Sequence, residues 1–196
     1  WPRIEGILRR VANDAGKLDE AAAARVEYEY RRLEAAQHRG DARGAQQAAD
    51  WIAVHGRGTA YELPALILVA READRAASSA AAEQRGEKRA QARDVYDRLV
   101  RLLGESPEAL KANKNSLAAA SKLAQYDEEL AHWPQAAERL WRLVEVLPSD
   151  RRLLRRAGLA MFRAGKHDQA LACFRTLVAG LPGGSDEWLE AKYYQL

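Results

Sequence analysis

The sequence is poor in cysteine and in side chains branched at Cβ. Its single cysteine, Cys173, excludes a disulfide within the chain and a zinc site built from cysteines. Valine, isoleucine and threonine, which favour strands, together supply only 15 of the 196 residues. The longest apolar stretch, residues 63–70, is far too short to span a membrane. The sequence contains no secretory signal. Because it starts at Trp1 and not at a methionine, this absence neither supports nor excludes secretion.

The chain also lacks a strong excess of one charge. The formal net charge is +3, and 24 of the 31 basic residues are arginine. The arginines are spread over most of the chain and alternate with glutamate and aspartate, whereas a nucleic-acid-binding domain concentrates basic residues on one face. This distribution disfavours nucleic-acid binding, which would have to show a steep dependence on salt.

Alanine, leucine, glutamate, arginine and glutamine fill most positions, and these residues lose little side-chain freedom in a helix. We therefore predict an all-α fold. Apolar residues recur at spacings of three and four, and prolines and glycines mark the ends of these segments. The predicted helices span residues 3–15, 18–39, 42–55, 63–84, 87–104, 107–131, 134–146, 151–164, 168–180 and 185–196.

An internal repeat is clearest near the end of the chain. Pro148 and Pro182 lie 34 residues apart, and each follows a helix with the same apolar offsets. Before Pro148 these positions are Ala136, Ala137, Leu140, Leu143, Val144 and Leu147. Before Pro182 they are Ala170, Leu171, Phe174, Leu177, Val178 and Leu181. Such self-similarity indicates a stack of repeated helical hairpins.

The repeat resembles the tetratricopeptide repeat family, whose motif combines an early aromatic, a Leu-Gly pair, a later Tyr, then Ala, Phe and a closing Pro. Residues 151–184 carry this pattern at Leu154, Ala157, Gly158, Met161, Ala170, Phe174 and Pro182. Residues 117–150 follow it less closely, with Asp127 in place of the later Tyr. The resemblance implies a right-handed α-α superhelix of stacked antiparallel helix pairs.

The repeat also suggests how the chain is organised. We expect one helical-repeat domain over residues 1–196, cut from a longer protein. Divergent, elongated hairpins occupy residues 1–106, because Ala45, Ala92, Ala136 and Ala170 are spaced by 47, 44 and 34 residues. Two well-matched repeats occupy 107–184, and 185–196 starts another. That last segment is apolar where a terminal repeat needs a polar face, so we expect this end to bind something, including a second copy.

Candidate chemical sites are weak. The four histidines fall at helix ends or turns, without the spacing of a metal site. The acidic groups Glu27/Glu29, Asp127–Glu129 and Asp186/Glu187 lie near arginines, as helix-stabilising surface pairs do. The segment 183–185 lacks the P-loop frame and is expected to be a turn. Trp51, Trp133, Trp141 and Trp188 are expected to pack within or between repeats. We therefore predict no catalytic residue, no cofactor and no metal.

The arginine-rich segment from Arg151 to Arg156 is the exception. Beside the core positions, Arg152, Arg155, Leu159, Phe162 and Arg163 share an adjacent helix face, and the preceding repeat offers Lys122 and Gln125. In the resembled family the first helix of each pair lines a concave groove that holds extended peptides. The face is similar to that family's carboxylate clamp, although the clamp's asparagines are not at matching places. A solvated or internally salt-bridged arginine cluster is the alternative interpretation.

The resemblance implies a non-catalytic scaffold that binds a protein or peptide segment, one with acidic character if the arginine face is used. A second hypothesis is a regulatory or substrate-presenting arm of a larger enzyme, with the chemistry elsewhere in that enzyme. A nucleic-acid-binding module ranks third.

Overall fold

The computed structural model describes residues 19–195, and in this range it contains helices and no strand. The all-α prediction is therefore confirmed. The helices are α2 (Asp19–Arg39), α3 (Ala42–His55), α4 (Glu62–Ser79), α5 (Ala82–Leu103), α6 (Pro107–Ala112), α7 (Lys114–Glu129), α8 (Trp133–Val146), α9 (Arg151–Arg163), α10 (His167–Gly180) and α11 (Asp186–Tyr193). The expected helix over 3–15 lies outside the described residues.

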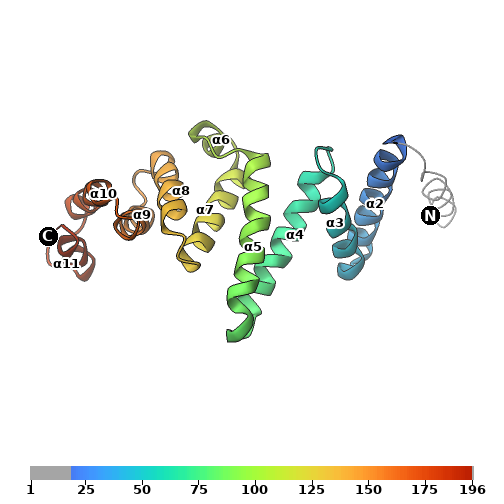
Figure 1. Cartoon of the computed structure of the whole chain (residues 1–196). Coiled ribbons are helices and arrows are strands. Elements are labelled where there is room, and N and C mark those ends of the chain that lie inside the picture. Colours follow the sequence, from blue (N-terminus) through green and yellow to red (C-terminus); the bar gives the residue numbers. More distant parts are fainter. Residues whose placement is uncertain (1–18, 196) are drawn as a thin grey trace. The chain divides into compact units, whose positions relative to one another are not determined.

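The chain forms two compact units, one ending at Ser78 and the other beginning at Ser79. In the second unit, α7, α8, α9 and α10 each pack on the next helix in the chain, and α11 packs on α10 (Figure 1). Helix α5 packs on α7, and α6 contacts both α7 and α8. The expected stack of helical hairpins is present over these residues, whereas a single domain and a right-handed superhelix stay predictions.

The first unit has its own core. Helices α2 and α3 pack against each other through small and branched residues, with Ala48, Ala49 and Ile52 fully buried. The half-buried rings of Tyr30 and Tyr61 lie 4.7 Å apart beside this core. Alanines at successive turns of α3 are buried in this contact.

Capping residues fix several helix starts at the predicted places. The side chains of Ser106, Asp150 and Ser185 accept hydrogen bonds from the backbone N–H three residues later. Gly165, in the turn between α9 and α10, has φ of +76°, which glycine adopts at little cost. These local signals explain why the predicted ends of α9 and α10 lie within one residue of the observed ends.

Two predicted helix boundaries were wrong. The break placed near Gly86 lies at residues 80–81 instead, and Gly86 sits inside α5. A Cβ at Gly86 would have open space around it, so this glycine marks an exposed helix position and not a turn. The predicted helix 107–131 is two helices, because Asn113 is extended and its side chain caps α7 by accepting from the N–H of Asn115. An asparagine at this position is a helix-start signal that the periodicity concealed.

In the best-matched repeat, a small residue faces a large one. A Cβ added to Gly158 would lie 2.9 Å from Cζ of Phe174, so α9 and α10 touch where α9 has no side chain. Phe174 and Ala170 are both buried on α10.

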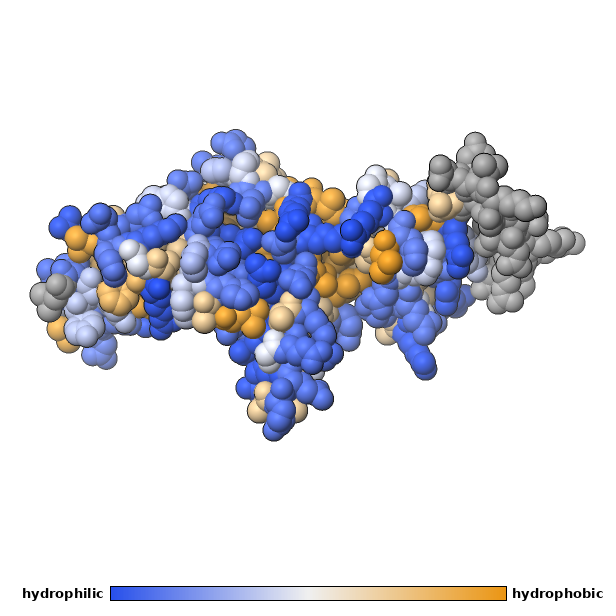
Figure 2. All heavy atoms as spheres, in the orientation of Figure 1, coloured by the Kyte–Doolittle hydropathy of each residue, from blue (hydrophilic) through white to orange (hydrophobic). Residues whose placement is uncertain are grey.

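Hydrophilic residues cover most of the face shown in Figure 2, and apolar residues occur there in smaller groups.

Candidate functional site

The predicted partner-binding residues lie on the first helices of two successive hairpins, α7 and α9. Helix α9 starts at the Asp150 cap, and its core stripe of Leu154, Ala157 and Met161 is buried against neighbouring helices. The remaining circumference bears Arg152, Arg155, Leu159, Phe162 and Arg163. Arg152 is exposed and has no ion-pair partner between residues 19 and 195.

Two arginines of α9 link it to other first helices. The guanidinium of Arg155 donates to both carboxylate oxygens of Glu190 on α11, at 2.8 and 2.7 Å. This hydrogen bond to Glu190 raises the pKa of Arg155. Arg156 donates from Nε to Glu128 on α7 at 3.0 Å. First helices α7, α9 and α11 are therefore joined in series by ion pairs.

The far end of the α9 face combines a cation with aromatic rings. The guanidinium of Arg163 lies 4.4 Å from the centre of the Trp133 ring on α8. Phe162 is 44% exposed, although its ring makes edge-type contacts with the rings of His167 and Tyr194, with 5.4 Å between ring centres in each case. Leu159 is half-buried. The surface near the end of α9 is thus partly apolar and partly basic.

On α7, the two predicted residues bond to each other. Lys122 donates to the side-chain oxygen of Gln125 at 3.4 Å, and its ammonium lies 5.7 Å from the Tyr126 ring centre. Gln125 in turn donates to Glu129 at 2.8 Å. Of the predicted arginines, Arg155 pairs with Glu190 and Arg163 lies over the Trp133 ring. Arg152 has neither an ion pair nor a ring contact among the described residues.

A larger charged network was missed in the sequence. Asp127 is fully buried and accepts from Arg93 of α5 at 2.8 Å and from Arg139 of α8, and His132 lies 3.7 Å away. Glu129 pairs with Arg89 of α5 at 2.8 Å. The expectation that Asp127–Glu129 form surface pairs within their own helix was wrong, because these carboxylates connect α7 to three other helices, α5, α8 and α9. The expected local pairs do occur between Arg31 and Glu34 and between Arg142 and Glu138.

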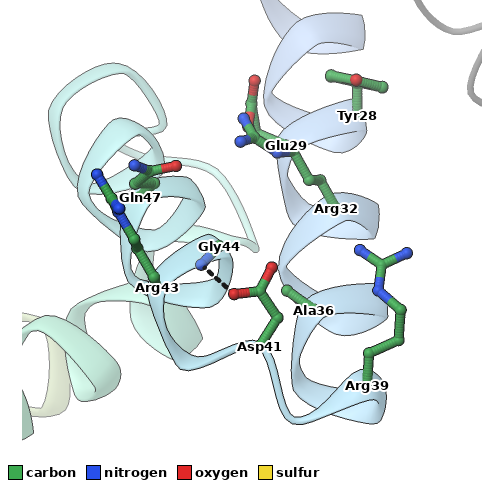
Figure 3. Close-up of a pocket in the computed structure, with 9 residues that line it drawn as sticks. All are labelled: Tyr28, Glu29, Arg32, Ala36, Arg39, Asp41, Arg43, Gly44 and Gln47. Carbon is green, nitrogen blue, oxygen red and sulfur yellow. Dashed lines mark hydrogen bonds and ion pairs between the residues drawn. The ribbon is translucent and has the colours of Figure 1, made fainter.

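The first unit contains a polar pocket between α2 and α3 (Figure 3), with a volume of about 510 Å³. Glu29 is nearly buried in its wall and accepts from Arg32 at 3.2 Å, and Asp41 caps the N–H of Gly44. Both carboxylates are thus engaged. Arg39 and Arg43 are exposed and have no partner among the described residues, so the lining offers two free cations to an anionic group such as a carboxylate.

The other residues singled out in the sequence lie at helix ends, in the core or in a turn. The described histidines lie at helix ends, and no group of three potential metal ligands occurs within residues 19–195. Cys173 is buried, and burial raises the pKa of its thiol. The segment 183–185 is a turn, with φ of +79° at Gly184. In the same part of the chain, no helix is long and apolar enough to cross a membrane.

The 34-residue repeat and the stacked helical hairpins together define a tetratricopeptide-like helical-repeat fold. Solved structures similar to the chain include the nearly identical TPR-like repeats of a protein described as a kinesin light chain from Podosopora anserina. That structure shares 16% identity, with a TM-score of 0.48, over 87% of this chain and 83% of its own. MamA, residues 41 to the end, from Desulfovibrio magneticus RS-1, shares 16% identity, with a TM-score of 0.43, over 86% of this chain and 90% of its own. The sequence matches no protein-family model and no curated protein.

Proposed function

We propose that this chain is a non-catalytic interaction scaffold whose first-helix face, formed by α7 and α9, binds an acidic segment of a partner protein. The observation that carries the proposal is Arg152, an exposed cation one helix turn from the chain's own Arg155–Glu190 pair. That pair is bidentate, which is the geometry a carboxylate of a partner would adopt with a guanidinium. The partner's acid binds Arg152 in the same way.

The neighbouring side chains support a peptide and not a small ion as the ligand. Phe162 is exposed about three turns farther along the same helix than Arg152, and aromatic residues and arginine are both enriched in protein interfaces. Leu159 lies between these two residues in the sequence and is half-buried. A segment that carries an acidic and an apolar residue can pair its acid with Arg152 and pack its apolar side chain on Phe162.

The pocket of the first unit supports the acidic character independently. Arg39 and Arg43 are free of described partners while both carboxylates in the lining are engaged. An acidic group bound there would be recognised by the same chemistry as one at Arg152. The proposal requires only the α7–α9 face.

The test is a selection of binders from a library of random short peptides, followed by affinity measurement with Arg152→Glu. Enriched peptides should be acidic. Arg152→Glu should lower their affinity for the chain by at least tenfold, because the substitution replaces attraction by repulsion. Exchanging the peptide's acid for lysine should restore binding to this variant. Arg175→Glu, which reverses an exposed arginine on the second helix α10, is the matched control. Equal losses from both reversals, or no acidic enrichment, would refute the proposed site.

A further inference from the structure

A second pocket lies in the second unit between the start of α6 and one face of α8, with a volume of about 580 Å³. Trp141 forms one wall, Ser106 and Pro107 form another, and three glutamates and one arginine complete the lining. The three glutamates are Glu105, Glu138 and Glu145, and the arginine is Arg142. The volume falls in the range of roughly 300–1,000 Å³ that ligand pockets occupy.

Carboxylates outnumber cations in the lining of this pocket. Arg142, the single cation of the lining, binds Glu105 at 2.6 Å and Glu138 at 2.5 Å, and Glu105 also lies 3.6 Å from Nε of Arg139. Glu145 is exposed and has no ion-pair partner within residues 19–195. Because Glu138, Trp141 and Glu145 are spaced by three and four residues on α8, they share one helix face beside the ring.

Each of the other described tryptophans has a cation of this chain over its ring. The distances to the ring centre are 5.1 Å for Arg25 and Trp51, 4.4 Å for Arg163 and Trp133, and 5.4 Å for Lys192 and Trp188. Trp141 has no such cation among the described residues. The comparison with Trp188 is direct, because Lys192 and Glu145 both follow their tryptophan by four residues.

From these contacts we infer that the Trp141 pocket binds a basic side chain, arginine or lysine, from a partner protein. The cation of the partner lies over the half-buried Trp141 ring, and its charge is matched by the free carboxylate of Glu145. At Trp188 the chain supplies that cation itself through Lys192; at Trp141 it supplies a carboxylate, and the ring is left for a cation from outside. This surface is separate in its residues and opposite in its charge preference from the α7–α9 face.

The inference is tested on the whole chain with two small probes, N-acetyl-Gly-Arg-Gly-amide and the same peptide with citrulline, the neutral isostere of arginine. The readout is the indole N–H resonance of Trp141 in a nitrogen-15 NMR spectrum, assigned by its loss in Trp141→Phe. We expect the arginine peptide to move this resonance saturably and to leave that of Trp188 in place. The citrulline peptide should have at most a small effect. An equal response to both peptides, or none to either, would overturn the inference.

Two substitutions at one exposed position sharpen the result. Glu145→Gln removes the free charge and should weaken binding of the arginine peptide about two- to fivefold, as expected for an exposed ion pair. Glu145→Lys recreates the arrangement of Trp188 and Lys192, and should abolish the response because the chain then covers its own ring. Glu83→Gln, an exposed glutamate in the first turn of α5, is the control and should bind as the natural chain does. Unchanged binding by both Glu145 variants would contradict the assigned role.

Discussion

Asp127 on α7 and Arg93 on α5 are joined in the interior of the second unit, with 2.8 Å between Oδ1 and Nε. The other carboxylate oxygen accepts from Arg139 on α8, which also donates to Asp97 at 3.1 Å. One buried carboxylate therefore holds a guanidinium from each side. Three helices of the stack, α5, α7 and α8, are therefore joined by one buried polar network.

The first prediction concerns this contact. Asp127→Ala leaves two guanidinium groups without their shared partner, and should lower the free energy of unfolding by about 3 kcal/mol. The value lies at the low end for buried pairs because both arginine side chains keep some access to water. Urea unfolding followed by circular dichroism measures the loss. Asp94→Ala is the matched control, since Asp94 also contacts Arg93 but is exposed, and it should change stability by less than about 1 kcal/mol.

The second prediction compares two glycines that both lie within helices. Gly158→Ala adds a Cβ that would meet the Phe174 ring at 2.9 Å, and the displacement should cost about 1–3 kcal/mol. The middle of this range, about 2 kcal/mol, exceeds the gain of about 1 kcal/mol from helix propensity, so the variant should be less stable. Gly86→Ala meets nothing within 4 Å and should stabilise by roughly 0.5–1 kcal/mol. The opposite order in thermal melts would show that α9 and α10 do not pack as described.

The third prediction uses the single cysteine as a probe of local opening. Cys173 is buried and the pKa of its thiol is raised by that burial, so less of the reactive thiolate is present at any given pH. Alkylation by iodoacetamide at pH 8 should be much slower than for a cysteine at the neighbouring exposed position, tested as Ala172→Cys with Cys173→Ala. Urea should bring the two rates together. Equal rates in the folded state would show that the α9–α10 contact opens readily.

The sequence alone predicted most of the helices because helix ends carry local signals. Ser106, Asp150 and Ser185 cap the helices that follow them, and the 34-residue spacing places α8 and α10 in the same register. The prediction of helix boundaries failed at Asn113, where one capping asparagine interrupts a long apolar period. It also failed at residues 80–81, where the break between helices contains no glycine or proline.

The charge network could not be predicted for a different reason. Asp127 and Arg93 are 34 residues apart and reside on separate helices, and no local spacing distinguishes a buried carboxylate from its exposed neighbours. One signal was present, because Asp127 takes the place of the tyrosine in the repeat motif. On the α9 face, the sequence placed the arginines correctly on one helix but could not show which of them are already engaged. The structure shows that Arg155 is engaged by Glu190 and that Arg163 is engaged by the Trp133 ring.

The most direct test of the scaffold proposal is to map where an acidic peptide binds. The backbone amide resonances of the isotopically labelled chain are followed while an enriched acidic peptide from the selection is added. We expect saturable shifts centred on the exposed faces of α7 and α9, largest near Gln125, Arg152, Leu159 and Phe162. Shifts confined to other helices of the second unit, with these four residues unmoved, would contradict it.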